Sequence, residues 1–362
     1  MVATLAHGDE DGPWLEIRPQ PERVIVHRGA VADVVFDLGL ENTADFNVKV
    51  TAVTAVFLEG DRAVGSVRLG RDFFKDEVYD RPTRLDRGRR ADWRAICLEG
   101  VPAGADRVRL DLELATRRLR GATSLESVEV GFDPAPQPLG LRLPFEGNWR
   151  VSQGHSCSND HRVGGFGGDF AWDFAAVGPG GRSSRSAEAG NNEDSYSFGK
   201  PVLAPIDGRV VRVIDDVPDQ EGRQSFPRRS LLDSLQRPDW IFGNFVVLDI
   251  GNGAFVLLAH LKQDSISVEP GQQVRAGDRL AECGNSGNSF DAHVHLQVMD
   301  RPDPAHPDVR GLPAVLVDYL QFVLVGQGEQ RDLFAERMPS GDPAEWSVVA
   351  PAQQGGEAWP LD

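Results

Sequence analysis

The first part of the chain is a series of short runs in which hydrophobic and polar residues alternate. The alternation is clearest at Val108, Leu110, Leu112 and Leu114. A period of two is that of a β-strand with one buried face. Gly, Pro and Asp residues separate the runs, as they do at turns. The pattern predicts seven strands, at residues 15–18, 23–27, 32–38, 48–58, 93–98, 108–114 and 128–132.

The number and spacing of these strands predict a fold class. Short strands separated by turn residues, with no helical period among them, are typical of a sandwich of two sheets. We expect an immunoglobulin-like β-sandwich over residues 1–135, in which no catalytic constellation is visible. The proline-rich sequence Pro134-Ala135-Pro136-Gln137-Pro138 follows, and it predicts a stiff linker over residues 136–144.

After this linker the β-type alternation continues, interrupted at intervals by glycines, and several histidines lie within it. His293 and His295 stand two residues apart, so in a strand both imidazoles project from one surface. His260 ends an apolar run, and Asp173 lies inside another. A carboxylate in such a run is costly to bury unless a cation or several donors meet it. Histidine nitrogens with one carboxylate form a ligand set that zinc accepts, so the pattern indicates a metal site.

Seven sequence blocks occur in a recognisable order in this second part. They are Trp172-Asp173-Phe174-Ala175 and residues 201–211, 243–249, 258–261, 268–278, 284–289 and 293–298. Their order resembles the M23 family of zinc metallopeptidases, the lysostaphin type, over about residues 145–325. The resemblance implies an all-β domain at residues 145–326, with an antiparallel sheet that forms a groove. It also implies one bound zinc ion (Zn2+) and hydrolysis of peptide bonds in bacterial peptidoglycan.

The resemblance assigns roles to single residues. The second histidine of the family's His-x-His pair is a zinc ligand and falls on His295, while the first is catalytic and falls on His293. The histidine of the family's Ala-His-Leu segment, also catalytic, falls on His260. The zinc-binding aspartate of its Asp-Phe segment falls on Asp173. The division of roles between His260 and His293 stays open.

The first zinc ligand departs from the commonest family pattern. That pattern has a histidine four residues before the aspartate, where this chain has Asp169. One branch of the family carries the histidine further upstream, after a Gln-Gly pair, and here Gln153-Gly154 precedes His155 and His161. We take His161 as the ligand, with His155 and Asp169 as alternatives. If this ligand is missing, the rival function is a catalytically degenerate M23-like domain that binds cell-wall peptide or a partner protein without cleavage.

Composition and local sequence argue against several other classes of protein. The formal net charge of −17 argues against a nucleic-acid partner, whose phosphates require a basic face. The arginines at positions 84, 87, 89 and 90 are interpreted as a solvated loop. Residues 282–287 lack the lysine that a biotinyl or lipoyl carrier domain needs in its turn. No apolar run is long enough to span a membrane. The remaining predicted partners are peptidoglycan peptides, and the oligomeric state stays open.

The two ends of the chain carry weaker signals. The first residues show no basic region before an apolar stretch, so a signal peptide is not visible, although the resemblance implies an extracytoplasmic place. Residues 327–362 are polar, with Pro and Gly, and predict a partly ordered tail in which residues 346–349 form a strand.

Overall fold

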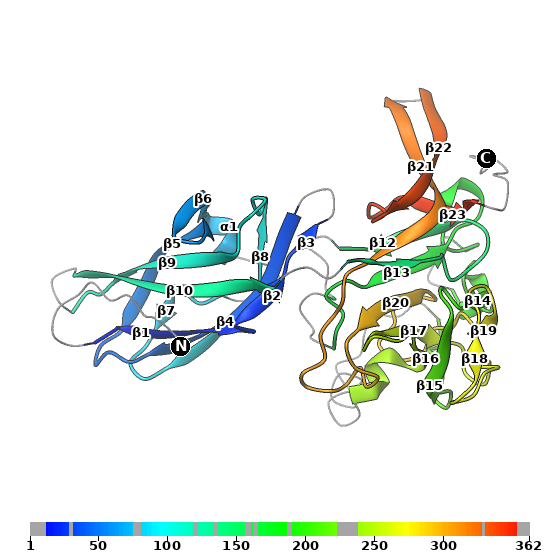
Figure 1. Cartoon of the computed structure of the whole chain (residues 1–362), viewed down its shortest axis with the longest axis horizontal. Helices are drawn as coiled ribbons and strands as arrows, with labels where there is room; N and C mark the ends of the chain where they lie inside the picture. The colour runs from blue at the N-terminus through cyan, green and yellow to red at the C-terminus, as the bar shows by residue number, and fades with distance from the viewer. Residues whose placement is uncertain are drawn as a thin grey trace. The chain divides into compact units, whose positions relative to one another are not determined.

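The computed structural model describes residues 12–28, 32–74, 81–118, 122–133, 137–155, 161, 166–186, 190–222, 238–327 and 330–352. The chain forms two compact units, Met1–Ala135 and Pro136–Asp362. Both units consist of β-strands, which confirms the predicted all-β class (Figure 1). Among the described residues the one α-helix is the short α1 (Arg71–Phe74). No helix in this part of the chain has the length and hydropathy needed to cross a bilayer.

The first unit contains two sheets that share a core. One sheet consists of β1 (Leu15–Gln20), β3 (His27–Arg28), β4 (Ala32–Asn42) and β8 (Arg90–Glu99). The other consists of β2 (Arg23–Ile25), β5 (Val48–Glu59), β6 (Arg62–Leu69), β7 (Arg84–Leu85), β9 (Arg107–Ala115) and β10 (Thr123–Asp133). Side chains from both sheets, among them Trp93 and Leu112, belong to one buried cluster. The unit is a two-sheet sandwich, and its immunoglobulin-like class stays a prediction.

All seven runs predicted for this unit lie in strands, with a break at Val26 between β2 and β3. The strand β6 is absent from the predicted set. It lies at the edge of its sheet, and most of its residues are exposed. Its residues are at most partly buried, so the strand lacks the regular apolar alternation by which it could be recognised.

The second unit is built on one long sheet (Figure 1). Its strands run in the order β11 (Leu139–Leu141), β21 (Ala314–Gln327), β23 (Val348–Pro351), β12 (Trp149–Gln153), β13 (Trp172–Ala176), β20 (Val294–Met299), β17 (Phe255–Leu261), β16 (Asn244–Asp249), β15 (Gly208–Ile214) and β18 (Gln273–Val274). β22 (Gln330–Gly341) pairs with β21, and β14 (Pro201–Leu203) pairs with β19 (Arg279–Glu282). Within the described residues, short 3-10 helices lie at Pro179–Gly181, Asn192–Asp194 and Pro238–Phe242.

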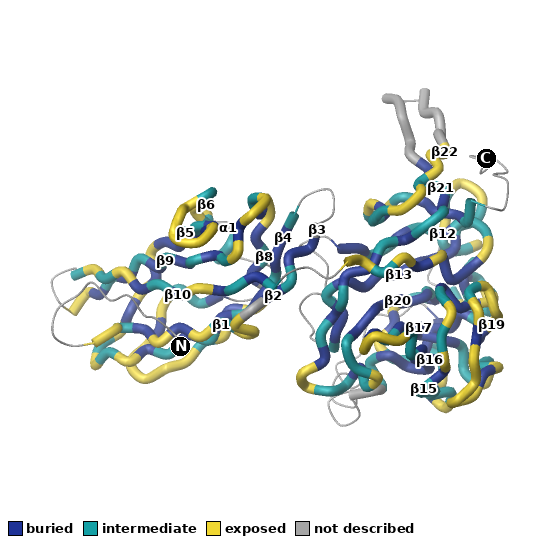
Figure 2. The backbone as a smooth tube through the Cα atoms, viewed as in Figure 1, coloured by how far each residue is buried: buried dark blue, intermediate teal, exposed yellow. Residues whose placement is uncertain are grey.

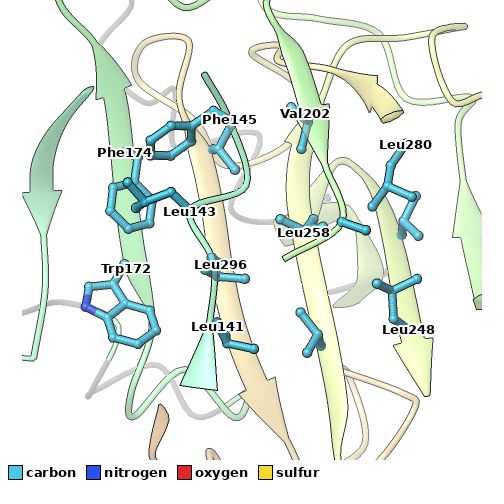
Figure 3. Close-up of a cluster of buried hydrophobic side chains, with 14 of the residues drawn as sticks. Leu141, Leu143, Phe145, Trp172, Phe174, Val202, Leu248, Leu258, Leu280 and Leu296 are labelled. Carbon is cyan, nitrogen blue, oxygen red and sulfur yellow. The ribbon is translucent and has the colours of Figure 1, made fainter. Parts of the chain in front are cut away.

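The centre of this sheet is covered on both faces. β13 and β20 are buried at every residue (Figure 2). Trp172 and Phe174 of β13 and Leu296 of β20 lie in the main hydrophobic cluster (Figure 3). Because side chains alternate along a strand, the residues between them point to the opposite face. Asp173 and His295 are therefore directed away from the main core.

Two segments differ from the expected boundaries. Residues 139–144 were expected in the linker, but β11 pairs in parallel with β21, and Leu141 and Leu143 belong to the core of the second unit. In the expected tail, β22 and β23 both belong to the long sheet, and β23 pairs with β12 and β21. A β-strand is present at residues 348–351, near the predicted one. Linker residues 134–136 lie outside the described residues.

Candidate metal centre

Strand register brings the candidate ligands together. Asp173 of β13 is paired directly with His295 of β20, and His295 is paired on its other side with Ala259 of β17. Directly paired residues have neighbouring Cβ atoms on the same face of a sheet. His293 and Gln297 lie two residues before and after His295, so they share that face.

The three predicted ligands form one cluster. Nδ1 of His295 lies 3.0 Å from Oδ1 of Asp173, and Nε2 of His161 lies 3.2 Å from Oδ2 of the same carboxylate. One donor atom from each of the three residues lies within 4.8 Å of the others, a separation suited to a metal ion. The structure therefore brings His161, the favoured candidate for the first ligand, together with Asp173 and His295.

The alternative first ligands have other contacts. Oδ2 of Asp169 accepts a hydrogen bond of 3.0 Å from the backbone N–H of Gly311. Nε2 of His155 donates to the carbonyl of Phe170 at 2.9 Å, and its Nδ1 lies 3.2 Å from a carboxylate oxygen of Asp342. Neither side chain belongs to the cluster around Asp173.

The donor set fits a divalent cation. Nε2 of His295 donates to Oε1 of Gln297 at 2.8 Å. In its neutral form this imidazole carries that single proton, so Nδ1 can present a lone pair to the Asp173 carboxylate. A cation between these two acceptors removes their repulsion. Two imidazoles and one carboxylate form a common catalytic zinc set that leaves a fourth position open.

His260 and His293 lie beside this cluster, with their rings 4.6 Å apart. Nδ1 of His260 donates to the carbonyl of Ser286 at 2.8 Å, and Nδ1 of His293 donates to the carbonyl of Asp291 at 2.7 Å. A carbonyl oxygen can only accept, so each ring carries a proton on Nδ1, and the neutral form of the ring has its lone pair on Nε2. Nε2 of His293 lies 3.4 Å from Oδ2 of Asp173.

A β-bulge turns His260 toward the other histidines. Val256 and Leu258 of β17 belong to the main core, so regular alternation would direct residue 260 into that core as well. The pairing with β16 shifts between Leu258 and Leu261, and His260 has a φ of +58°. Leu261 takes the core position instead. A bulge commonly redirects a side chain in this way next to a functional site.

The turn that holds His260 depends on two glycines. Gly287 has a φ of +74°, and a Cβ on it would lie 2.3 Å from the backbone nitrogen of Gly243. This close approach lets the Ser286 hydroxyl accept from the N–H of Asn244 at 2.9 Å and donate to the carbonyl of Leu261 at 2.6 Å. The Ser286 carbonyl is thereby fixed at His260.

The pKa values of Asp173 and His260 are both lowered, but for different reasons. Burial disfavours the charged form of Asp173, but the neighbouring His161 and His293 outweigh it and hold the pKa of this carboxyl well below its usual range. Burial lowers the pKa of His260 well below the ordinary value, and His293 and His295 lower it further. Asp173 is thus kept anionic and His260 neutral, as a ligand and a proton acceptor require.

Gln297 is a site residue that the sequence argument missed. It is fully buried, accepts from His295 through Oε1 and donates through Nε2 to the carbonyl of Phe166 at 2.9 Å. The second bond orients the amide, so the oxygen faces the imidazole. An outer acceptor of this kind fixes the tautomer of a metal-binding histidine. Its position two residues after His295, on the same strand face, was a usable signal.

We predict that Gln297→Leu weakens zinc binding about 10–100-fold, because His295 loses the acceptor that keeps its Nδ1 deprotonated. Competition with a chelator measures the affinity directly. Gln297→Glu retains an acceptor, and it should bind zinc more tightly than Gln297→Leu. Val298→Ala, in the same buried strand but with its side chain in the main core on the other face, is the packing control. Equal zinc affinity in folded Gln297→Leu and the wild type would contradict this role.

Comparisons with known proteins give one family. Residues 195–307 match the model of Peptidase family M23. This segment contains His260, His293 and His295, whereas His161 and Asp173 precede it.

Solved structures of M23 proteins are also similar to this chain. The catalytic domain of the prophage-encoded M23 protein EnpA from Enterococcus faecalis is 17% identical, with a TM-score of 0.28, over 49% of this chain and 93% of that chain. A putative peptidase M23 from Pseudomonas aeruginosa is 18% identical, with a TM-score of 0.29, over 73% and 87%. The catalytic domain of the antimicrobial peptidase lysostaphin from Staphylococcus simulans is 17% identical, with a TM-score of 0.24, over 42% and 80%. At such low scores the three structures carry no further argument. The family match over residues 195–307 confirms the resemblance to peptidase family M23 that the order of the sequence blocks predicts.

Proposed function

We propose that the second unit is a zinc-dependent endopeptidase that hydrolyses peptide bonds of bacterial peptidoglycan. The observation that carries this proposal is the convergence of His161 and His295 on the two oxygens of Asp173, at 3.2 and 3.0 Å. These three residues would hold the zinc ion. The substrate class comes from the M23 family, and an extracytoplasmic place of action is part of the same proposal.

Zinc held by this set would supply Lewis acidity, which lowers the pKa of water to about 7 and polarises a peptide carbonyl. His260 and His293 supply the proton transfers. Because Nδ1 donates to a backbone carbonyl, the neutral form of each ring presents a lone pair on Nε2. One of them accepts the proton of the attacking water and returns it to the leaving amine. The other, when protonated, donates a hydrogen bond to the developing oxyanion.

Solvent exposure indicates the side of approach. The side chains of His161 and His293 are 18% and 14% exposed, whereas that of His295 is 4% exposed. The peptide would therefore approach along the edge formed by His161 and His293. His295 and Gln297 lie deeper, where they would bind and orient the metal side of the site and not contact the peptide.

Digestion of purified peptidoglycan, followed by mass analysis of the soluble fragments, tests the proposal. The zinc-loaded full chain should release fragments with new amino termini, and a chelator should stop the release until zinc is restored. We expect about one zinc ion per chain. Intact peptidoglycan after incubation with the zinc-loaded protein would favour the rival, a domain that binds wall peptide without cleaving it.

A further inference from the structure

The first unit contains a cleft of about 950 Å³ with a cationic lining. Its charged lining residues are Lys49, Arg84, Arg87, Arg117 and Arg118, with Asp45 as the one carboxylate among the residues that line it. The whole chain carries a net charge of −17, so five cations around one cleft run against its composition. Arg84 and Arg87 are exposed, as expected for a solvated loop, and two further segments add Lys49, Arg117 and Arg118 beside them.

The cleft lies at one end of the six-stranded sheet. Lys49, near the start of β5, is paired directly with Arg84 of β7 on one side and with Ala115 of β9 on the other. Like charges directly opposite each other across a strand pair are destabilising. Arg117 and Arg118 follow immediately after β9 and extend the positive charge. Because the pairing of Lys49 with Arg84 lowers the stability of the fold, it points to a role other than stabilisation.

Among the described residues, two of the five cations have a carboxylate partner. Arg84 lies 3.2 Å from Asp86, and Arg118 lies 3.0 Å from Asp45. Within the described part of the chain, Lys49, Arg87 and Arg117 form no ion pair, and all three are exposed. The loop that carries Arg87 is itself fixed, because its backbone N–H donates to the side chain of Asn47 at 3.0 Å. The cleft is therefore lined by positive charges that the described carboxylates do not neutralise.

We propose that this cleft binds an oligoanion that carries phosphate groups. Guanidinium groups present paired donors that match phosphate oxygens, and a lysine adds a point charge. A terminal phosphate carries about −1.5 to −2 charge at pH 7, more than a carboxylate does, which suits the adjacent Lys49 and Arg84. The acidic remainder of the surface is screened beyond about 8 Å at physiological salt. This site lies in the first unit and does not depend on the peptidase proposal.

Binding to the full chain tests the proposal with two probes, inorganic tripolyphosphate and a poly(glycerol phosphate) chain. The double variant Lys49→Glu/Arg87→Glu should bind the phosphate probes at least about tenfold more weakly, since each lost contact to a charged group costs about that factor. Arg18→Glu/Arg62→Glu is the matched control. It changes the net charge equally at two exposed arginines that do not line the cleft, and it should bind as the wild type does.

The outcomes separate the sources of the phosphate. Tighter binding of tripolyphosphate assigns the cleft to a free oligophosphate, and tighter binding of the polymer assigns it to a phosphodiester chain. The proposal is overturned if neither probe binds at 150 mM salt, about the physiological level, or if the control variant loses as much affinity. Equal binding of poly-glutamate at matched charge would also overturn it. The single variant Arg87→Gln, with a smaller loss, guards against misfolding, and Asp173→Ala should bind both probes normally.

Discussion

Asp173→Ala will leave the purified chain without zinc and without hydrolysis of peptidoglycan peptides. Asp173 is the residue that both His161 and His295 approach, so its loss removes one ligand and leaves two imidazoles without an anion between them. Loss of an outer-sphere partner alone costs about 10–100-fold in metal affinity, and loss of a direct ligand should exceed that. Metal analysis after gel filtration gives the stoichiometry, and the peptidoglycan digest gives the activity.

Asp169→Ala is the matched control for this experiment. It removes a carboxylate four residues earlier, whose partner is the backbone N–H of Gly311. We expect it to retain about one zinc ion per chain. If Asp169→Ala loses the metal while Asp173→Ala keeps it, the assignment of the centre is wrong.

The sequence marks Asp173 and His295 as candidate ligands because each stands out within a strand pattern. A carboxylate inside the apolar run of β13 requires a partner, and two histidines two residues apart require a common face. Their direct pairing across β13 and β20 is a matter of register, which the two patterns do not specify. The order of the sequence blocks supplied that link.

The sequence favours His161 as the first ligand and leaves two alternatives open. His155, His161 and Asp169 all lie within reach of Asp173 along the chain, and loop conformation decides among them. Asp169 is drawn to the Gly311 amide, and His155 to the carbonyl of Phe170. Tertiary packing brings these two contacts about, and the sequence does not show it. Of the three candidates, His161 is the one whose side chain lies beside Asp173.

Alternation also fails where the strand itself is irregular. A strict period of two would place His260 with Leu258 in the main core, and only the bulge with its positive φ turns the ring to the other face. The sequence did not predict the strand β11, because three residues next to a proline-rich sequence are too few to show alternation. Its parallel partner, β21, lies far along the chain.

His260→Gln and His293→Gln should each lower the rate of peptidoglycan hydrolysis about 10²–10⁴-fold, the usual contribution of a positioned acid or base. Neither change should reduce zinc content, because the ligand cluster consists of His161, Asp173 and His295. If the two histidines act as one unit, the double variant should be little worse than the more damaged single variant. Rates measured on zinc-saturated protein keep metal affinity separate from the chemical step.

His306→Gln provides the comparison, since this histidine lies in a partly exposed loop near Asp308 and outside the cluster. It should retain both zinc and activity. The informative alternative concerns His293, whose Nε2 lies 3.4 Å from Oδ2 of Asp173. Loss of zinc from His293→Gln would make this residue a ligand, and His260 would then be the remaining proton carrier. Full activity in both single variants would remove histidine catalysis from the proposal altogether.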